Sequence, residues 1–256
     1  MKINEIKSFL ESCFPSSLSE EWDNDGDMIL TDGEREVTGV VTTLDVTDSA
    51  VDKAIEKGAN LIVSHHPLIF KPLKRLDGSA ISKRIERLIK ADISVLSYHT
   101  RFDSADGGMN DLLAEKLELI NPEPFGFKGE IPMGRIGDFP ECSPGEFAAM
   151  ISSLLNTDVV FFEGNRQVRR VAVLGGGGKD FIHLANTLGA DAMVTGDISY
   201  SVANDELPYG ITMVDAGHYS TEIISVDAFA DIIEKNFNTS VYRFYGCNPA
   251  KIVVKE

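Results

Sequence analysis

The sequence predicts an α/β fold of two related α/β units with mixed sheets and helices packed on those sheets. Apolar runs of strand length alternate with amphipathic helical segments along the chain, which is typical of this class. The order of elements also repeats. Residues 39–66 align without a gap with residues 170–197, and residues 93–100 align with residues 211–218.

We expect the first unit over residues 1–127 and the second over residues 128–256, with a C-terminal helix that can pack back on the first unit. Apolar spacing predicts the elements of the first unit. In chain order they are a helix with Ile3, Ile6, Phe9 and Leu10 on one face, a strand over 37–44, a helix over 48–57 ended by Gly58, a strand over 61–64, a helix with Ile81, Ile85, Leu88 and Ile89 on one face, a strand from Ile93, and a helix through Leu112, Leu113 and Leu117. We interpret Asn121-Pro122-Glu123-Pro124, with Gly126 and Gly129, as a linker.

A run of four glycines, Gly175-Gly176-Gly177-Gly178, follows a predicted strand in the second unit and precedes a helix. It is not a P-loop, because Lys179 is followed by Asp180 and not by Ser or Thr. Its backbone amides could contact a phosphate, or it could form a tight turn without a ligand. Both interpretations stay open at this point.

Four of the five histidines follow apolar runs that predict strands. His65 and His66 follow one run and precede Pro67, which cannot continue a strand's hydrogen bonding. His99 follows a second run and His218 a third. A single pair of histidines would more often be one core residue and one surface residue. Because α/β sheets place their sites beyond the carboxyl ends of the strands, three such ends with histidines favour a metal site, which we expect in the cleft between the two units.

Two of these strand ends add a carboxylate at the spacing of one helical turn. Asp103 lies four residues after His99, and Glu222 lies four residues after His218. Glu222 precedes a predicted helix over 223–237, so its charge could also serve the dipole of that helix.

These motifs resemble the signature of the NIF-three-like dinuclear-metal family, whose members are often named GTP cyclohydrolase 1 type 2 homologs. The resemblance covers nearly the whole chain and is to the short form without the inserted domain. It is carried by Glu21-Trp22-Asp23-Asn24, Ser64-His65-His66-Pro67-Leu68-Ile69-Phe70, His99-Thr100-Arg101-Phe102-Asp103 with Gly107-Gly108-Met109-Asn110, Val194-Thr195-Gly196-Asp197 and Gly217-His218-Tyr219-Ser220-Thr221-Glu222. The chain departs from the usual family pattern at Arg101, where the family has Asn, at Gly26-Asp27, and at Tyr200-Ser201.

The resemblance implies that two divalent metal ions are bound. The implied ligands are His65 and Asp103 for one ion, His66 and His218 for the other, and Glu222 as a bridge between them. A bridging carboxylate suits two ions about 3.5–4 Å apart. His99 is expected to be the catalytic residue, as a proton donor or as a group that orients the ligands, and Tyr219 is a weaker candidate for a general acid. The donor set suits Zn, Fe, Mn, Co or Ni and does not select among them.

The net charge of −16 argues against nucleic acid as a main partner, because phosphate neutralisation dominates that affinity. One basic group exists, formed by Lys71, Lys74, Arg75, Lys83, Arg84 and Arg87. An ordinary solvated surface is its simpler interpretation, although a small anionic, nucleotide-like substrate would need only one or two such cations, and Arg101 is a further one.

The remaining features suit a cytoplasmic protein. The charged N-terminus lacks the apolar segment of a signal peptide, and no apolar stretch is long enough for a membrane span. The three cysteines are odd in number and far apart, which is typical of reduced thiols, and none lies near the histidine motifs in sequence.

Three functions remain open. The first is metal-dependent hydrolysis of a nucleotide-like small molecule, for which the family name points to opening of the guanine ring of GTP. The second is a metal-dependent phosphoesterase, since a two-metal site accepts many substrates. The third is a non-enzymatic metal-binding or adaptor protein. The resemblance implies a homohexamer.

Overall fold

The computed structural model describes residues 1–251 and divides the chain into two compact units. Unit 1 comprises Met1–Phe102 together with the described residues from Ser225 onward, and unit 2 comprises Asp103–Ile224. This division differs from a single boundary after residue 127. The segment from Asp103 onward belongs to unit 2, because its helix and strand pack in that unit, and the C-terminal part returns to unit 1.

Unit 1 is built on a five-stranded sheet with the strand order β1-β4-β3-β2-β11. β4, β3, β2 and β11 run parallel to one another, and the edge strand β1 pairs antiparallel with β4. The elements of this unit are α1 (Ile3–Cys13), η1 (Ser16–Leu18), β1 (Gly26–Ile29), β2 (Val40–Thr43), α2 (Asp48–Lys57), β3 (Leu61–Ser64), α3 (Ala80–Lys90), β4 (Ser94–Ser97), α10 (Ile224–Asn236) and β11 (Val241–Phe244), and the unit boundary falls inside α4 (Thr100–Ser104).

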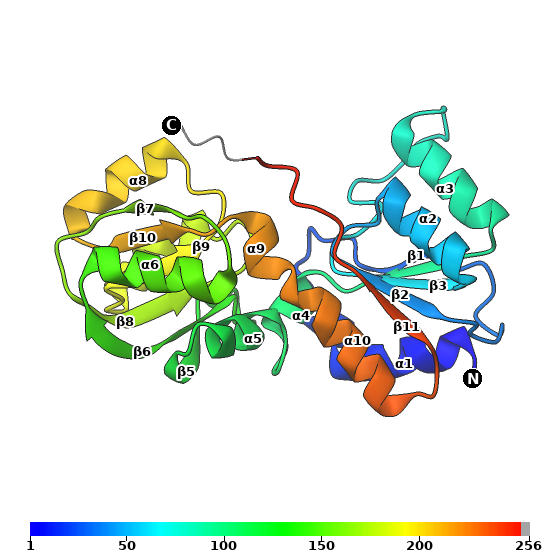
Figure 1. The fold of residues 1–256 in the computed structure, drawn as a ribbon, viewed down its shortest axis with the longest axis horizontal. Helices are drawn as coiled ribbons and strands as arrows, with labels where there is room; N and C mark the ends of the chain where they lie inside the picture. The colour runs from blue at the N-terminus through cyan, green and yellow to red at the C-terminus, as the bar shows by residue number, and fades with distance from the viewer. Residues whose placement is uncertain (252–256) are drawn as a thin grey trace. The chain divides into compact units, whose positions relative to one another are not determined.

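Helices cover both faces of this sheet, with α2 and α3 on one face and α1 and α10 on the other (Figure 1). One core joins Val41, Ile62 and Val95 of the central strands to α2 and α3. The central strands are buried at every position, as parallel strands between two helical layers require. The predicted helix over 48–57 is confirmed, and Gly58 ends it in the left-handed conformation with φ of 63°.

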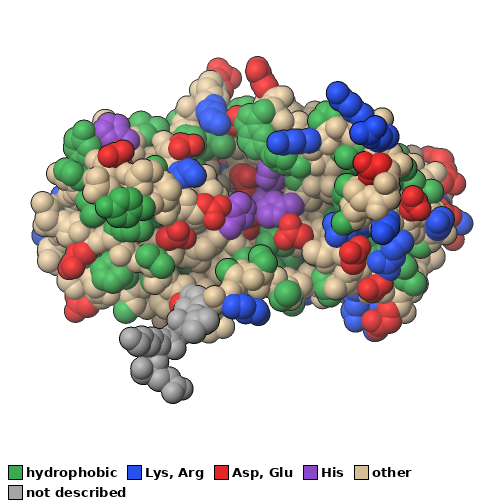
Figure 2. Space-filling view, turned by 90° about the horizontal axis from the view of Figure 1, so that it is seen from above, with side chains coloured by type: hydrophobic (Ala, Val, Ile, Leu, Met, Phe, Trp, Pro, Cys, Tyr) green, Lys and Arg blue, Asp and Glu red, His purple; other side chains and the backbone are tan. Residues whose placement is uncertain are grey.

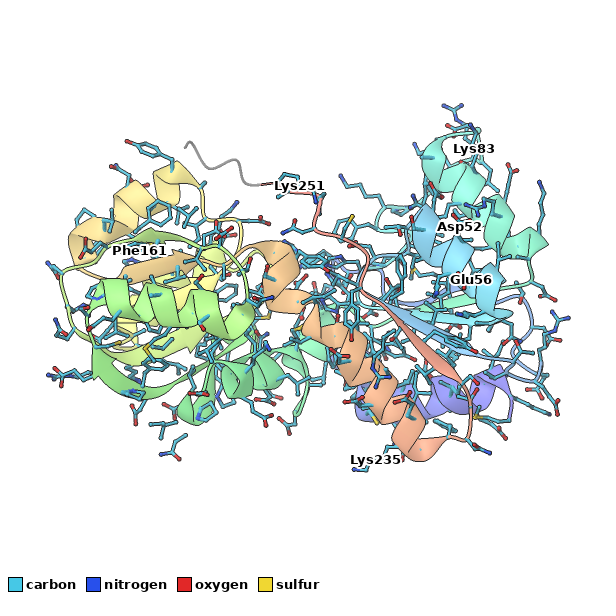
Figure 3. All side chains as sticks on the ribbon, viewed as in Figure 1. Asp52, Glu56, Lys83, Phe161, Lys235 and Lys251 are labelled. Atoms are coloured by element: carbon cyan, nitrogen blue, oxygen red, sulfur yellow. The ribbon has the colours of Figure 1, made fainter. Side chains whose placement is uncertain are left out.

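The solvent faces of α2 and α3 carry paired charges. Arg84 of α3 lies 3.1 Å from Asp48 of α2, and Arg87 pairs with Asp48 and Asp52. Figure 3 labels Asp52 on α2 and Lys83 on α3 among the outward-facing side chains. The arginines of the basic group on α3 are therefore used in ion pairs between helices, which agrees with a solvated helix surface.

Unit 2 is built on a six-stranded mixed sheet with the order β5-β6-β8-β9-β10-β7. β8, β9 and β10 are parallel, and the flanking strands pair antiparallel. Its elements are α5 (Met109–Lys116), β5 (Ile120–Phe125), β6 (Gly134–Cys142), α6 (Pro144–Leu155), β7 (Val160–Phe162), β8 (Val168–Val173), η2 (Lys179–Phe181), α7 (Ile182–Thr187), β9 (Ala192–Thr195), α8 (Tyr200–Glu206), η3 (Leu207–Tyr209), β10 (Thr212–Asp215) and α9 (His218–Glu222).

Successive side chains of the central strands serve two separate cores. Val171 and Val173 of β8 face a core with α5 and α6, and Ala172 between them faces a core with α7 and α8. Two mixed sheets with helices packed on them confirm the predicted α/β class.

The predicted linker around residue 121 is wrong. Residues Ile120–Phe125 form the edge strand β5, which pairs antiparallel with β6 despite Pro122 and Pro124. An edge strand tolerates proline because one of its sides forms no ladder hydrogen bonds, and the pairing is irregular between Ile120 and Glu123.

The internal repeat is visible in the strand registers of the two units. Val40 of β2 pairs with Leu61 of β3, and Val171 of β8 pairs with Ala192 of β9, so the same 21-residue separation recurs. The third strand follows in parallel in both units, as β4 beside β3 and as β10 beside β9. The gapless alignment of the two sequence halves therefore corresponds to equivalent strand–helix–strand segments.

None of the helices in residues 1–251 is both long and apolar enough to cross a bilayer. The three cysteines are free thiols, with Cys13 and Cys142 half-buried and Cys247 exposed. The absence of paired cysteines means that hydrophobic cores, and not covalent crosslinks, hold each unit together.

Candidate metal centre

Unit 1 gathers three histidines at the carboxyl ends of two neighbouring strands. His65 and His66 directly follow β3, and His99 lies two residues beyond β4, which pairs in parallel with β3. One ring nitrogen of each histidine lies within 4.8 Å of those of the other two. His65 is fully buried, whereas His66 and His99 are half-buried. Histidine side chains also reach the molecular surface, as the space-filling view shows (Figure 2).

Each of these imidazoles is held through Nδ1. His65 Nδ1 lies 2.9 Å from the Tyr98 carbonyl oxygen, and His66 Nδ1 lies 2.8 Å from Asp45 Oδ1. His99 Nδ1 lies 2.9 Å from Asp23 Oδ1. An oxygen acceptor requires the proton on Nδ1, and the neutral ring then presents a lone pair at Nε2. This is the tautomer and the orientation that metal-binding histidines have in proteins.

Asp23, which orients His99, is itself held by hydrogen bonds from Thr100. The backbone N–H and the hydroxyl of Thr100 both donate to Asp23 Oδ2, at 3.1 and 2.7 Å. Burial alone would raise the pKa of this carboxyl, but the hydrogen bonds from His99 and Thr100 outweigh burial and lower the pKa to about 2. Asp23 is therefore a carboxylate that holds the His99 ring in one position.

Unit 2 gathers one histidine and two carboxylates. His218 and Glu222 lie one turn apart in α9, with His218 Nε2 at 3.0 Å from Glu222 Oε2. His218 Nδ1 lies 2.8 Å from Asp197 Oδ2, which repeats the carboxylate–imidazole pairing of unit 1. Asp103 offers a carboxylate oxygen within 4.8 Å of Glu222. Glu222 is buried and is the member of this group that reaches both of the others.

The donor chemistry of both groups fits divalent ions. A carboxylate and an imidazole lone pair about 3 Å apart repel each other unless a proton or a metal cation lies between them, and two nearby carboxylates have the same need. Nitrogen and oxygen ligands of this kind suit the first-row divalent metals. The buried histidine and glutamate side chains could thus hold a metal ion.

The glycine run lies against Glu222 and His218. A Cβ on Gly176 would overlap Glu222 Oε1 and lie 3.2 Å from His218 Nε2. The amides of Gly175, Gly176 and Gly178 donate to side-chain oxygens of unit 2, those of Asn110, Thr221 and Thr195. Of the two interpretations, the structure favours a tight turn that makes room for Glu222, since three of its four amides already have protein acceptors.

Arg101 does not face the histidine group. Its guanidinium is buried and makes two hydrogen bonds to Asp25, from Nε at 2.8 Å and from Nη2 at 2.6 Å. It also lies over the Tyr98 ring, 5.3 Å from the centroid. This residue, at which the sequence departs from the family pattern, forms an internal ion pair of unit 1.

The residues that sequence reasoning missed are the orienting carboxylates. Asp23 and Asp197 lie in motifs that resemble those of the family, but the sequence alone assigns no role to them or to Asp45. Asp45 follows β2 by two residues, so a carboxylate just beyond a strand end was the signal that could have found it. Tyr219 lies beside His218 in α9 and is half-buried, and its role as a general acid stays a prediction.

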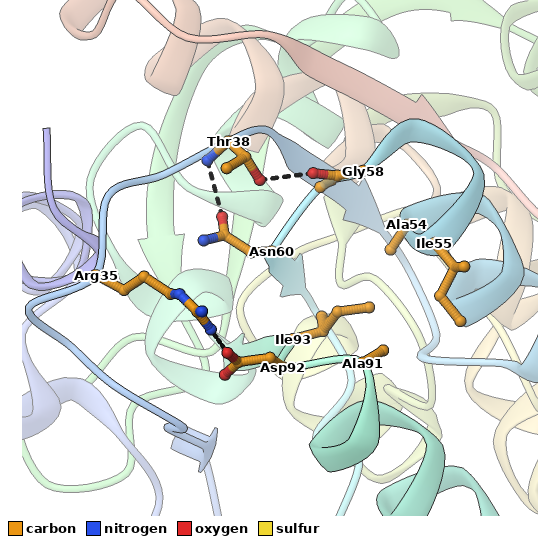
Figure 4. A pocket seen from close by; sticks show the side chains of 10 residues that line it. Arg35, Thr38, Ala54, Ile55, Gly58, Asn60, Ala91, Asp92 and Ile93 are labelled. Atoms are coloured by element: carbon orange, nitrogen blue, oxygen red, sulfur yellow. Dashed lines mark hydrogen bonds and ion pairs between the residues drawn. The ribbon is translucent and has the colours of Figure 1, made fainter.

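Two cavities of unit 1 lie at opposite ends of the parallel strands. One of about 480 Å³ is lined by His66, Asp45, Arg84 and Cys247, so one cysteine does lie near the histidine group. The other, of about 420 Å³, lies at the amino ends of β2, β3 and β4 (Figure 4).

The polar groups of this second cavity bond to one another. Thr38 bonds to Asn60 and to the Gly58 carbonyl, and Arg35 pairs with Asp92. These contacts stabilise the ends of β2, β3 and α3. The candidate metal-binding residues His65, His66 and His99 lie at the opposite end of the sheet.

The mixed sheets and the histidine and carboxylate groups at their strand ends define an α/β protein with a candidate metal centre. The chain belongs to the Duf34/NIF3 (NGG1p interacting factor 3) family, whose model matches residues 1–246. This confirms the family that the sequence motifs resembled.

Similar proteins support the same family. A GTP cyclohydrolase 1 type 2 homolog of Clostridium perfringens is 35% identical over 231 residues, which cover 87% of each chain. A protein of the same name from Staphylococcus aureus is 27% identical over 348 aligned positions, which cover 93% of this chain and 94% of that one. Because 348 positions exceed the 256 residues of this chain, that relative has inserted residues. The crystal structure of a Bacillus cereus protein related to NIF3 superposes with a TM-score of 0.89, at 27% identity and 99% coverage of both chains.

Proposed function

We propose that this protein is a dinuclear metal-dependent hydrolase that acts on a nucleotide-like small molecule. In this proposal the ligand groups of the two units serve one centre. One ion is held by His65 and Asp103, the other by His66 and His218, and Glu222 bridges the two. Two features support joining the groups: Glu222 is the ligand of unit 2 within reach of both Asp103 and His218, and α4 continues from the end of β4 directly to Asp103.

The orientation of the imidazoles is the observation that carries the proposal. His66 and His218 each have Nδ1 2.8 Å from a carboxylate oxygen, and His65 has Nδ1 against a backbone carbonyl. His183, which lies in none of the possible ligand groups, also has Nδ1 3.1 Å from a Glu206 oxygen, so this orientation alone does not identify a metal ligand. His65, His66 and His218 combine it with membership of groups whose possible ligand atoms lie within 4.8 Å of one another, and a common role for Nε2 as a metal ligand explains that combination.

Bound divalent ions would supply Lewis acidity and lower the pKa of a water molecule, which is the chemistry that hydrolysis at neutral pH requires. His99 would hold or deliver a proton at Nε2, because Asp23 binds Nδ1 and keeps the ring beside His65 and His66. Asp45 and Asp197 would keep the His66 and His218 rings in their ligand orientation.

The name shared by the relatives points to GTP, and opening of its guanine ring with release of formate is the reaction to test first. The test is a mass-spectrometric turnover screen of nucleotides and small phosphoesters with metal-loaded protein. Glu222→Ala provides the blank, and Glu163→Ala, an exposed glutamate of unit 2, controls for the loss of a carboxylate as such.

Formate and a ring-opened product, made by the wild type and by Glu163→Ala but not by Glu222→Ala, would establish the cyclohydrolase activity. Free phosphate or a cleaved ester, formed with the same dependence on Glu222, would show that the protein is a phosphoesterase and not a cyclohydrolase. Two bound metal ions without turnover of any compound in the panel would contradict the hydrolase and favour a metal-binding or adaptor protein.

We also propose a cytoplasmic homohexamer. The free cysteines agree with a reducing compartment, and the hexamer is what the family resemblance implies. Light scattering coupled to gel filtration measures the assembly directly, because six copies of a 28.0 kDa chain would give a mass about six times that of the monomer. A monomer or dimer at micromolar concentration would contradict the hexamer without affecting the metal proposal.

A further inference from the structure

Two large aromatic side chains beside His99 are exposed to solvent. Trp22 is 56% exposed and Phe70 is 48% exposed. Trp22 precedes β1, and Phe70 follows the His65-His66-Pro67 motif, so the two rings come from segments far apart in the sequence. A hydrogen bond from the Asn24 side chain to the Ile69 carbonyl joins these segments next to the rings. Exposed aromatic side chains that are held in place are typical of binding surfaces.

The rings of Trp22, Phe70 and His99 lie close together without stacking face to face. The Trp22 and Phe70 centroids are 5.9 Å apart with the planes tilted by 56°. His99 lies 6.0 Å from Trp22 and 6.2 Å from Phe70, in edge-on arrangements of 80° and 79°. Because neither large ring covers the face of the other, a flat ligand ring could stack on Trp22, contact Phe70 and lie beside His99.

The segment after Phe70 is basic, although the chain has a net charge of −16. Lys71, Lys74 and Arg75 are all exposed. Arg75 has Asp77 at 3.9 Å, whereas neither Lys71 nor Lys74 is within ion-pair distance of a carboxylate among residues 1–251. Uncompensated cations next to an aromatic surface match a ligand that has both a planar ring and anionic groups.

We propose that Trp22 and Phe70 form a stacking site for the planar heteroaromatic ring of the substrate, and that Lys71 and Lys74 contact its phosphate groups. This proposal rests on the proposed function, because it gives the nucleotide-like substrate a binding surface next to His99. It assigns specificity for the ring to Trp22 and Phe70, and affinity for the phosphates to the two lysines. Neither part depends on the identity of the metal.

Trp22 is the only tryptophan of the chain, so its fluorescence reports directly on this surface. We would titrate the Glu222→Ala protein, in which turnover is blocked, with GTP, guanosine and inorganic triphosphate. Stacking predicts quenching by GTP, weaker quenching by guanosine at the same concentration, and none by triphosphate alone. The same titration with ATP and CTP measures how far the site distinguishes one base from another.

Phe70→Ala is expected to raise the GTP dissociation constant about fivefold or more, which is the usual scale for loss of one stacking contact. Phe127→Ala is the matched control, because Phe127 is 55% exposed and belongs to unit 2. Lys71→Ala with Lys74→Ala should weaken the binding of GTP and leave that of guanosine unchanged, and the loss should diminish at high salt.

The outcomes separate this proposal from the proposed function. Quenching by nucleotides without turnover by the wild type would support the stacking site and contradict the hydrolase. Turnover with the same KM in Phe70→Ala and the wild type would keep the hydrolase and overturn the stacking site. If no nucleotide quenches Trp22, or if Phe70→Ala changes only the mass of the assembly, the stacking site is also wrong, and in the second case the two rings form a contact between copies of the chain.

Discussion

The hydrogen bond that His66 and His218 each donate from Nδ1 determines that Nε2 is the nitrogen available to a metal ion or a substrate. His66 and His218 come from different units, yet each has Nδ1 against a carboxylate that follows another strand of its own sheet, Asp45 or Asp197. Such partners fix the tautomer and raise the basicity of the ligand nitrogen, and their loss typically weakens metal binding 10–100-fold. The position of the histidines at predicted strand ends was visible in the sequence. Which ring nitrogen is available to a metal was not, because it depends on carboxylates that follow neighbouring strands of the sheet.

Replacing Gly176 by alanine is expected to lower the bound metal. The new Cβ would displace the Glu222 carboxylate and approach His218. Gly58→Ala is the control, because Gly58 has φ of 63° against 64° for Gly176 and has open space around the added Cβ. Metal per chain, measured by elemental mass spectrometry with circular dichroism as the check of folding, should fall in Gly176→Ala only. Equal metal contents in the two variants would mean that Gly176 serves only the backbone conformation.

His99→Ala is expected to lower turnover about 100-fold or more while most of the metal stays bound, because general acid–base catalysis typically contributes this much. His99→Gln is the companion variant, since it keeps a polar side chain that cannot transfer a proton in the same way. The measurement pairs kcat with metal per chain for each variant. A loss of metal as large as that of Glu222→Ala would make His99 a ligand instead of a proton carrier.

Asp23→Asn tests the lowered pKa of Asp23. A carboxyl with a pKa of about 2 in the folded state and 3.8 when unfolded stabilises the fold by about 2 kcal/mol above pH 4, and this contribution is lost as the pH falls from 4 towards 2. The stability difference between metal-free wild type and Asp23→Asn should therefore stay constant above pH 4 and shrink as the pH falls from 4 towards 2. Urea unfolding across this range measures it, and a constant difference would show that the carboxylate charge of Asp23 is not the cause.

At the scale of elements, the parallel strands and their connecting helices were the predictable part. β2, β3 and β4 are four-residue runs buried on both faces, and the apolar segments over 37–44, over 61–64 and from Ile93 predicted them. β9 was predictable only as the counterpart of β3 in the gapless alignment. β5 was not predictable in the same way, because its prolines and exposed side chains resemble a loop. Its place at a sheet edge, which depends on pairing with β6, makes this composition possible.

The buried ion pair between α4 and the segment before β1 gives an element-scale prediction. Asp25→Ala would leave the Arg101 guanidinium buried without its partner, at a cost of about 3–5 kcal/mol in the free energy of unfolding. Arg101→Met combined with Asp25→Ala should recover much of this loss, because no buried charge is then unpaired. Denaturant unfolding of the two variants and of Arg101→Met alone provides the measurement. Additive losses would show that the two residues stabilise the fold independently.

At the scale of the whole molecule, the repeat explains why each unit has residues of the candidate metal centre at corresponding strand ends. His66 follows β3 by two residues, as Asp197 follows β9, and the two positions are equivalent in the gapless alignment. The gapless alignment of the two sequence halves predicts this equivalence, because paired residues of the first two parallel strands are 21 positions apart in both units. It did not reveal where the units divide, since α4 and the C-terminal helix continue across the division without a change in composition.

The proposed single centre, with ligands assigned to it from both units, makes a prediction about metal stoichiometry. His66→Ala and His218→Ala remove ligands assigned to the same ion, so each variant should keep one ion per chain, and the double variant should also keep one. His65→Ala combined with His66→Ala removes a ligand of each ion and should leave almost none.

Elemental analysis after gel filtration at a fixed, low concentration of free metal measures these ratios, with His183→Ala, a half-exposed histidine of unit 2 paired with Glu206, as the control that keeps both ions. Residues that serve one ion share a single loss when their substitutions are combined, so the metal losses of His66→Ala and His218→Ala should not add. If the losses of His66→Ala and His218→Ala instead add up to two ions, the two units bind metal separately, and the shared centre is wrong even if each ligand group is real.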